Sequence, residues 1–192
     1  MDFDKTVSAV IDGNELKYGV LHGNENIFFI KCGAGGTIPG YEDKYLKMAH
    51  RVHESLGATV ICASNYEKCL EMDKRAIEWC ARYLELEEAE LYLVGVSDGA
   101  DQCIALSRNA PTKKLLCINP SFVPGHDPSD RLILRSKVEK IFVYGTKDDE
   151  GYELLPKLKE RAIPNFEIRW VEGADHSFTG MVDEFIALID LI

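Results

Sequence analysis

The sequence contains no cluster of lysine and arginine residues and no long apolar segment. Its 32 acidic residues outnumber the 22 basic ones, and the formal net charge is -10. Because nucleic acids and anionic lipid surfaces attract clustered cations, neither is an expected partner. No stretch approaches the roughly 18 apolar residues of a membrane-spanning helix, and MDFDKTVSAVIDGNE lacks the pattern of a secretory signal. We therefore expect a soluble, cytoplasmic protein that binds neither nucleic acid nor membrane.

The six cysteines lack the spacing of a metal site. No two of them form a CxxC pair, and none is followed by histidine at a zinc-binding spacing. Several lie among apolar residues, as in VICAS and LLCIN, where a reduced cysteine behaves as a small buried hydrophobe. We therefore expect free thiols and no bound metal.

Short apolar runs alternate with amphipathic segments along the chain. A length of 192 residues with 46% hydrophobic residues suits one domain over residues 1–192. The apolar runs are rich in β-branched, aromatic and leucine residues, which is typical of strands covered on both faces. The predicted strands cover 26–32, 58–64, 91–97, 114–120, 140–146 and 166–173. The predicted helices cover 42–56, 69–84, 98–109, 151–162 and 181–191.

The amino-terminal segment TVSAVIDGNELKYGVLHG has a different pattern. It contains two strand-like stretches joined by Asp12-Gly13-Asn14, a turn sequence of the hairpin type. The alternation of strands and helices after it predicts a mostly parallel sheet covered by helices. The expected fold class is therefore α/β, a three-layer α/β/α sandwich whose sheet carries an antiparallel amino-terminal hairpin.

A serine lies between two glycines in the segment Gly95-Val96-Ser97-Asp98-Gly99. The apolar run LYLV precedes this segment and the helical pattern ADQCIALSR follows it, which is the strand-turn-helix setting of a serine nucleophile. Side chains at the flanking glycine positions would collide with the neighbouring strand and helix. In this setting the backbone N–H of Asp98 points at an acyl oxygen, and its carboxylate is expected to face solvent or the site entrance. The alternative is a structural serine in a turn.

Acidic residues and a histidine follow two later strand patterns. KIFVYGTKDD ends with Asp148 and Asp149, and FEIRWVEGADHSF contains Asp175 and His176. A serine hydroxyl needs a base to take its proton, and the base needs an acid to orient it. Because the carboxyl ends of parallel strands lie at one edge of a sheet, these residues are expected near Ser97. Asp148 and Asp149 compete for the acid role, whereas Asp175 is adjacent to His176 and its side chain should diverge from the imidazole.

A loop of small residues follows the first parallel strand pattern, NIFFIKC. The loop reads Cys32-Gly33-Ala34-Gly35-Gly36-Thr37, and its small side chains would let backbone N–H groups approach a developing oxyanion. The alternatives are a flexible connection or a degenerate phosphate loop. The spacing matches neither GxGxxG nor a following GK[ST].

Together, the segments CGAGG, GVSDG, GTKD and GADHSF resemble those of the α/β-hydrolase superfamily, and the resemblance extends over nearly the whole chain. Within this superfamily, the chain resembles a small, lidless serine hydrolase of the esterase or thioesterase type. The resemblance implies that Ser97 is the nucleophile and that His176 is the general base and later acid. It also implies that Asp148 orients the imidazole, since its spacing from Gly145 fits the family pattern better than that of Asp149.

The resemblance also implies an oxyanion hole. The backbone N–H groups of Asp98 and Ala34 would form it, with Gly35 as the alternative to Ala34. The loop departs from the family in one respect, because Cys32 occupies a position where the family usually has histidine.

The expected activity is hydrolysis of an ester or thioester of a small or exposed acyl group, through an acyl-enzyme and without a metal or organic cofactor. Segment 121–137 is too short for a lid domain, which predicts an open site with Tyr41, Phe122 and Val123 as its apolar wall. The alternatives are a non-catalytic binding protein, or a peptidase or acyltransferase, on the same fold. The expected partner is a small molecule, and the chain is expected to be a monomer or a small homo-oligomer.

Overall fold

The computed structural model describes residues 1–11, 14–65, 70–108, 110–120, 137–149 and 164–192. These residues form an eight-stranded sheet with the order β1-β2-β4-β3-β5-β6-β7-β8. The strands are β1 (Lys5–Ile11), β2 (Asn14–Leu21), β3 (Asn24–Lys31), β4 (Ala58–Ala63), β5 (Glu90–Val96), β6 (Thr112–Ile118), β7 (Glu139–Gly145) and β8 (Phe166–Val171). The helices are α1 (Lys44–Leu56), α2 (Leu70–Tyr83), α3 (Asp98–Leu106) and α6 (Val182–Ala187), with 3-10 turns at Tyr41–Asp43 and Leu188–Leu191.

The strand directions confirm the mostly parallel sheet with an antiparallel amino-terminal hairpin. Strand β1 pairs with β2, and β2 with β4, in antiparallel fashion. All pairings from β4 through β3 to β8 are parallel. The hairpin turn at 12–13 and the predicted helix at 151–162 lie outside the described residues.

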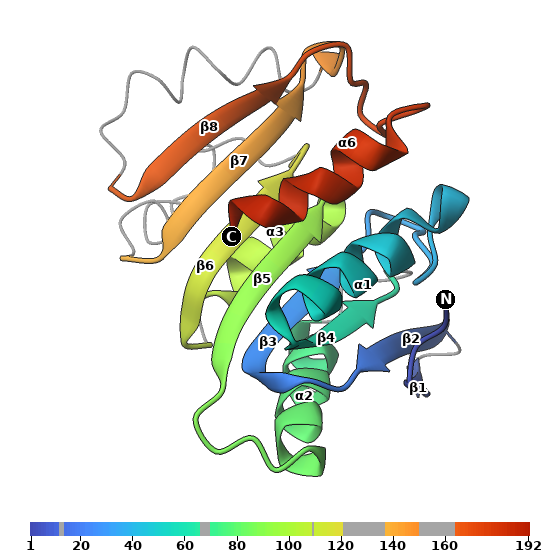
Figure 1. Cartoon of the computed structure of the whole chain (residues 1–192), viewed down its shortest axis with the longest axis vertical. Helices are drawn as coiled ribbons and strands as arrows, with labels where there is room; N and C mark the ends of the chain where they lie inside the picture. The colour runs from blue at the N-terminus through green and yellow to red at the C-terminus, as the bar shows by residue number, and fades with distance from the viewer. Residues whose placement is uncertain (12–13, 66–69, 109, 121–136, 150–163) are drawn as a thin grey trace.

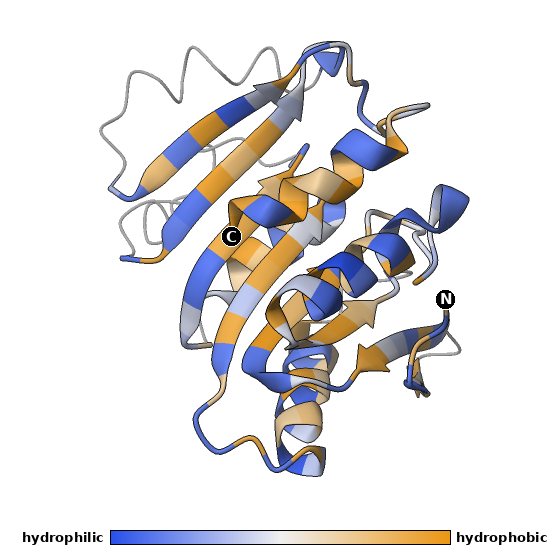
Figure 2. Ribbon diagram, viewed as in Figure 1, coloured by the Kyte–Doolittle hydropathy of each residue, from blue (hydrophilic) through white to orange (hydrophobic). Residues whose placement is uncertain are grey.

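Helices cover both faces of the sheet. In Figure 1, α1 and α6 lie in front of the sheet, whereas α2 and α3 lie behind it. Tyr45, Met48 and Phe185 are buried in the core on the α1 and α6 face. Cys80 and Cys103 are buried in the core on the opposite face. Because both faces are covered, the central strands are apolar and buried over most of their length, after polar first residues in β3, β5 and β6 (Figure 2), in agreement with the predicted apolar runs.

The strand order places a topological switch between β3 and β5. From β3 the chain crosses one face through α1 to reach β4, and from β5 it crosses the other face through α3 to reach β6. The loops that leave the carboxyl ends of β3 and β5 therefore diverge to opposite faces. In open parallel sheets, ligands bind in the crevice that such diverging loops leave. Cys32 and Ser97 follow directly on these two strand ends.

Candidate active site

Ser97 occupies a sharp turn between β5 and α3. Its backbone has φ 52° and ψ -127°, a left-handed conformation that is strained for a residue with a side chain. Its N–H donates to the carbonyl oxygen of Ile118 on β6 at 2.8 Å, and its own carbonyl accepts from Ala100 N–H at 2.8 Å. The strand, turn and helix expected around Ser97 are therefore present, and the turn is held from both sides.

The two glycines that flank Ser97 have no room for a side chain. A Cβ atom on Gly99 would lie 2.2 Å from the carbonyl oxygen of Cys32, and one on Gly95 would lie 2.4 Å from the Cα of Ala100. Both obstacles are backbone atoms, which cannot rotate away. The close packing of β5, α3 and the end of β3 therefore requires glycine at both positions, as the sequence pattern predicted.

Ser97, His176 and Asp148 lie in one hydrogen-bonded row. The distance from His176 Nε2 to Ser97 Oγ is 2.9 Å, and the distance from His176 Nδ1 to Asp148 Oδ2 is 3.0 Å. The Asp148 side chain is 3% exposed, whereas that of His176 is 37% exposed. An imidazole whose Nδ1–H donates to the carboxylate has an unprotonated Nε2 that can accept the serine proton. Ser97, Asp148 and His176 follow β5, β7 and β8, whose carboxyl ends lie at the same edge of the sheet.

The turn after β7 directs its two consecutive aspartates differently. The N–H of Asp148 donates to the carbonyl of Gly145 at 3.1 Å, which closes the turn, and the N–H of Lys147 donates to Ala174 at 2.9 Å. Asp148 is consequently buried beside His176, whereas Asp149 is exposed. Of these two aspartates, only Asp148 forms a hydrogen bond with the imidazole of His176.

Asp175 is engaged with its own loop. Its Oδ1 accepts from the N–H of Ser177 at 3.0 Å and from that of Thr179 at 2.9 Å. These bonds lower the pKa of Asp175 below its usual value, and the bond from the N–H of Thr179 contributes most. Lys44 Nζ donates to the carbonyl of Ser177 at 3.0 Å, and burial lowers the pKa of this lysine. The loop that carries His176 is thus fixed by local and long-range contacts.

The small-residue loop after β3 forms a tight turn beside Ser97. The N–H of Gly36 donates to the carbonyl of Gly33 at 2.8 Å, and Gly35, at the third position of the turn, has φ 67°. A Cβ atom on Gly33 would lie 3.5 Å from the Cβ of Ser97, so the start of the loop faces the serine. Ala34, the second residue of the turn, is exposed. The backbone of this turn therefore lies next to the turn that carries Ser97.

The carboxylate of Asp98, expected to face solvent or the site entrance, is half-buried and bound by two side-chain amides. Its Oδ2 accepts from Asn65 Nδ2 at 3.1 Å and from Gln102 Nε2 at 2.8 Å. The same Asn65 amide donates to the carbonyl of Cys32 at 3.1 Å, and Asn65 N–H donates to Gly36 at 2.9 Å. A half-buried carboxylate needs such donors. The side chain of Asp98 consequently ties the turn at Ser97 to the loop after β3.

A surface pocket of about 300 Å³ lies beside the histidine and the buried aspartate. Its lining residues are Lys147, Asp148, Asp149, Asp175, His176 and Ser177. Tyr41, an expected wall residue, is 60% exposed and is not part of this lining. The other two expected wall residues, Phe122 and Val123, lie outside the described residues. Most of segment 121–137, which was expected to be too short for a lid, also lies outside them.

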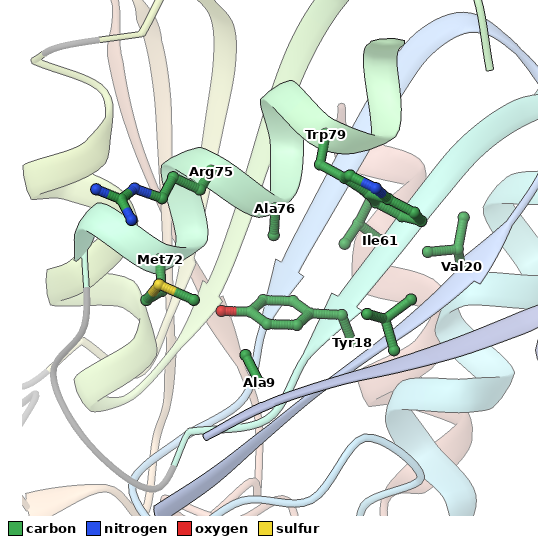
Figure 3. Close-up of a pocket in the computed structure, with 9 residues that line it drawn as sticks. Ala9, Tyr18, Val20, Ile61, Met72, Arg75, Ala76 and Trp79 are labelled. Carbon is green, nitrogen blue, oxygen red and sulfur yellow. The ribbon is translucent and has the colours of Figure 1, made fainter. Parts of the chain in front are cut away.

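A second pocket, of about 190 Å³, lies between the β1-β2 hairpin and α2 (Figure 3). Tyr18 and Ile61 of the sheet and Ala76 and Trp79 of α2 line it, and its surface is almost wholly apolar. It contains none of Ser97, Asp148 and His176. Within the described ranges, no group of three or more His, Cys, Asp or Glu side chains is arranged to hold a metal ion.

Two buried asparagines at the site were missed by the sequence analysis. Asn65 follows β4 and contacts the loop after β3 and Asp98, and Asn119 follows β6 and contacts the loop that carries His176. The available signal was their position, because each is a polar residue soon after a buried parallel strand. Such positions lie at the edge where parallel α/β sheets bind ligands.

Comparison with solved structures identifies the fold. An α/β serine hydrolase homologue from Coxiella burnetii superimposes with a TM-score of 0.74 at 16% identity, covering 98% of this chain and 97% of that one. The chain has the α/β-hydrolase fold. The esterase domain of a Rhodothermus marinus protein gives 0.73 at 16% identity, covering 97% and 95%. An α/β serine hydrolase without a lid from Xanthomonas campestris gives 0.64 at 18% identity, covering 98% and 93%.

No protein-family model matches the chain, and no curated protein matches it. At identities of 16–18%, the likeness to the α/β-hydrolase structures concerns the fold. A shared fold does not determine the reaction, which depends on the residues of the site. None of the helices in the described part of this α/β-hydrolase fold is long and apolar enough to cross a membrane.

Proposed function

We propose that this chain is a serine hydrolase that cleaves an ester or thioester of a small or exposed acyl group. The observation that carries the proposal is the hydrogen-bonded row from Ser97 through His176 to Asp148, with distances of 2.9 and 3.0 Å. It lies at the carboxyl edge of an α/β-hydrolase sheet, the fold shared with the esterase domain from Rhodothermus marinus. Ser97 is the nucleophile, His176 the general base, and Asp148 the residue that orients the imidazole.

In the first step the Oγ of Ser97 attacks the acyl carbon. Nε2 of His176, 2.9 Å from Oγ, takes the hydroxyl proton as the oxygen–carbon bond forms. The imidazolium that results is stabilised by the carboxylate of Asp148, which is 3% exposed and therefore little screened by water. The imidazolium then gives its proton to the departing alcohol or thiol, and the acyl group remains bonded to Ser97.

In the second step a water molecule replaces the leaving group. Nε2 of His176 takes a proton from this water, the hydroxide oxygen bonds to the acyl carbon, and the bond to Oγ breaks. The proton returns to Ser97, and the carboxylic acid leaves. His176 is 37% exposed, so water reaches the imidazole without a large rearrangement.

Backbone N–H groups stabilise the oxyanion that forms in both steps. The N–H of Asp98 lies at the amino end of α3, where the helix dipole favours negative charge. The N–H of Ala34 belongs to the turn beside Ser97. The link from Asp98 through Asn65 to Cys32 and Gly36 keeps these two amide-bearing segments in fixed relation. Preorganised donors of this kind contribute most when they do not move during the reaction.

A fluorophosphonate probe tests the proposal, because it bonds covalently to activated serine oxygens. We expect intact mass measurement to show one adduct per chain and peptide mapping to locate it on Ser97. We expect no adduct in His176→Ala. The control is Ser177→Ala, since Ser177 is exposed next to His176 but its side chain is outside the row. This variant should be labelled like the wild type.

A probe that does not react, or that reacts at another serine, would contradict the proposal and favour a non-catalytic binding protein. The acyl group is tested separately with aryl esters of increasing acyl chain length and with the matching thioesters. The pocket beside His176 is a surface feature of about 300 Å³. We expect short acyl chains to be turned over best, and a strong preference for long chains would refute the small-acyl part of the proposal.

A further inference from the structure

Asn119 is a completely buried polar residue directly after β6, beside the candidate site. It has 0% exposure and follows Ile118, which accepts the N–H of Ser97. Its φ of 44° is in the left-handed region, where asparagine is tolerated better than most residues with a side chain. Its own N–H donates to Val143 on β7 at 2.8 Å. The backbone therefore directs the side chain to a defined place between β7 and the loop after β8.

The side-chain amide of Asn119 bonds to two different loops. Its Oδ1 accepts from the N–H of Gly145 at 2.9 Å. Its Nδ2 donates to the carbonyl of His176 at 2.9 Å and to that of Asp175 at 3.2 Å. The amide nitrogen therefore has acceptors in a buried place where an unpaired donor is costly.

These contacts connect the two segments that carry the histidine and its acid. Gly145 is the residue whose carbonyl accepts the N–H of Asp148, so the amide holds the turn of Asp148 at its first residue. At its other end the amide holds the backbone of His176 itself. Because the amide is planar and rigid, it fixes the separation of the two segments. We infer that Asn119 is a positioning residue that sets the contact between Asp148 and His176 for the acyl transfer.

This inference rests on the roles proposed for His176 and Asp148. Their hydrogen bond tolerates only a small displacement. The distance from Nδ1 to Oδ2 is 3.0 Å, and a separation of about 3.6 Å is no longer a hydrogen bond. A shift of either loop by less than 1 Å would therefore break it. Misplacements of about 1 Å can lower catalysis about 100-fold.

Two variants of Asn119 separate the amide from the backbone. Asn119→Asp keeps the shape, the tolerance for the left-handed backbone and the acceptor for Gly145, but replaces the donor with an oxygen that faces two carbonyls. Asn119→Gly keeps the backbone conformation and removes the amide altogether. Each is compared with wild type below its own melting temperature, so that an effect on stability alone does not change the rate.

Asn165 offers a matched control. It also has a left-handed backbone, with φ 51°, and its Nδ2 donates to a backbone carbonyl, that of Lys137, at 2.8 Å. It lies just before β8, at the sheet edge opposite to Ser97. Asn165→Asp and Asn165→Gly therefore make the same chemical changes away from the candidate site.

We expect both Asn119 variants to lower kcat for a short-chain aryl ester about 100-fold with little change in KM, because the loss is one of alignment rather than binding. We expect the Asn165 variants to keep the wild-type kcat. In ¹H NMR spectra, we expect a low-field signal from the proton between Nδ1 of His176 and Asp148, and its loss in Asp148→Asn would assign it. This signal should disappear in the Asn119 variants and persist in the Asn165 variants.

A wild-type kcat in either folded Asn119 variant would overturn the inference, and so would a loss expressed in KM alone or a low-field signal that persists. The NMR signal needs no turnover. If the wild type neither turns over esters nor reacts with a fluorophosphonate, the proposed function fails, while the NMR comparison still decides whether Asn119 holds Asp148 against His176.

Discussion

Lys31 and Asp73 form an ion pair that is almost completely shielded from solvent. Lys31 Nζ lies 2.9 Å from Asp73 Oδ2, with side-chain exposures of 0% and 1%. The hydroxyl of Tyr18 donates to the same carboxylate at 3.1 Å, and Lys31 also donates to the carbonyl of Ser64 at 3.0 Å. Burial raises the pKa of Asp73, and Lys31 opposes this. The pair attaches α2 to the end of β3, one residue before the loop at Cys32.

Breaking this pair should be costly, because either partner alone is a buried charge without its counterion. We expect Lys31→Met and Asp73→Asn each to lower the free energy of unfolding by about 3–5 kcal/mol, and the double variant to lose clearly less than the sum. Urea unfolding of all four proteins measures this. Arg75→Ala, which removes an ion pair to Glu71 that is about two thirds exposed, should cost less than about 1 kcal/mol. Additive losses at Lys31 and Asp73 would refute the coupling.

The two aspartates after β7 should differ sharply in their effect on activity. Asp148→Asn keeps the shape of the side chain but favours the wrong tautomer of His176, and we expect kcat for a short-chain aryl ester to fall about 10⁴-fold. Asp149 is exposed, so Asp149→Asn should leave kcat nearly unchanged. Steady-state kinetics on both variants checks this. The reverse result would assign the acid role to Asp149.

Gly99 should be intolerant of any side chain. The Cβ in Gly99→Ala would lie 2.2 Å from the carbonyl of Cys32, and we expect a loss of more than about 3 kcal/mol of folding free energy or no soluble protein. Gly180→Ala is the control, since Gly180 has φ 70° but nothing within 4 Å of an added Cβ. It should lose only about 1–2 kcal/mol, from the left-handed backbone. Thermal or urea unfolding distinguishes collision from backbone strain, and equal losses would contradict the packing argument.

Asp175 should contribute stability that depends on pH. Its pKa in the folded state is below the usual 3.8, chiefly because Thr179 N–H donates to it. The folded state therefore releases this proton more readily than the unfolded state, so the contribution is present above pH 3.8 and is lost as the pH falls through the lower folded value. We expect Asp175→Asn to be less stable than wild type at about pH 6, and the difference to shrink as the pH falls through the folded pKa of Asp175. A difference that does not shrink would contradict the assignment.

Much of the fold follows from local pattern. The predicted strand at 58–64 is β4 at Ala58–Ala63, and the predicted helix at 69–84 is α2 at Leu70–Tyr83. Apolar periodicity and turn residues determine secondary structure over a few neighbouring residues, so these elements can be predicted directly from the sequence. The ends of two elements differ from the prediction: the strand predicted at 166–173 ends at Val171, and the helix predicted at 181–191 passes into a 3-10 turn at Leu188. Final helical turns often tighten in this way.

The sequence by itself also indicated which residue types the candidate site contains. Ser97, an acid and His176 follow three strand patterns, and parallel strands end at one edge, so their meeting could be expected. Apart from the family resemblance, the sequence offers no physical argument for Asp148 over Asp149, because both follow the same strand. The tertiary structure buries one and exposes the other through the turn closed at Gly145.

Only the tertiary structure revealed the buried polar groups that hold the site together. Asp73 lies on an amphipathic helix where its charge predicts a surface position, yet it is buried because Lys31 is its counterion from a distant strand. Asn119 and Asn65 are ordinary turn residues in sequence, but each amide bonds to loops far away in the chain. Local propensity carries no information about such partners. Their positions are set by which loops the sheet order brings together, and the hydrogen bonds form because those buried groups have no water to bind.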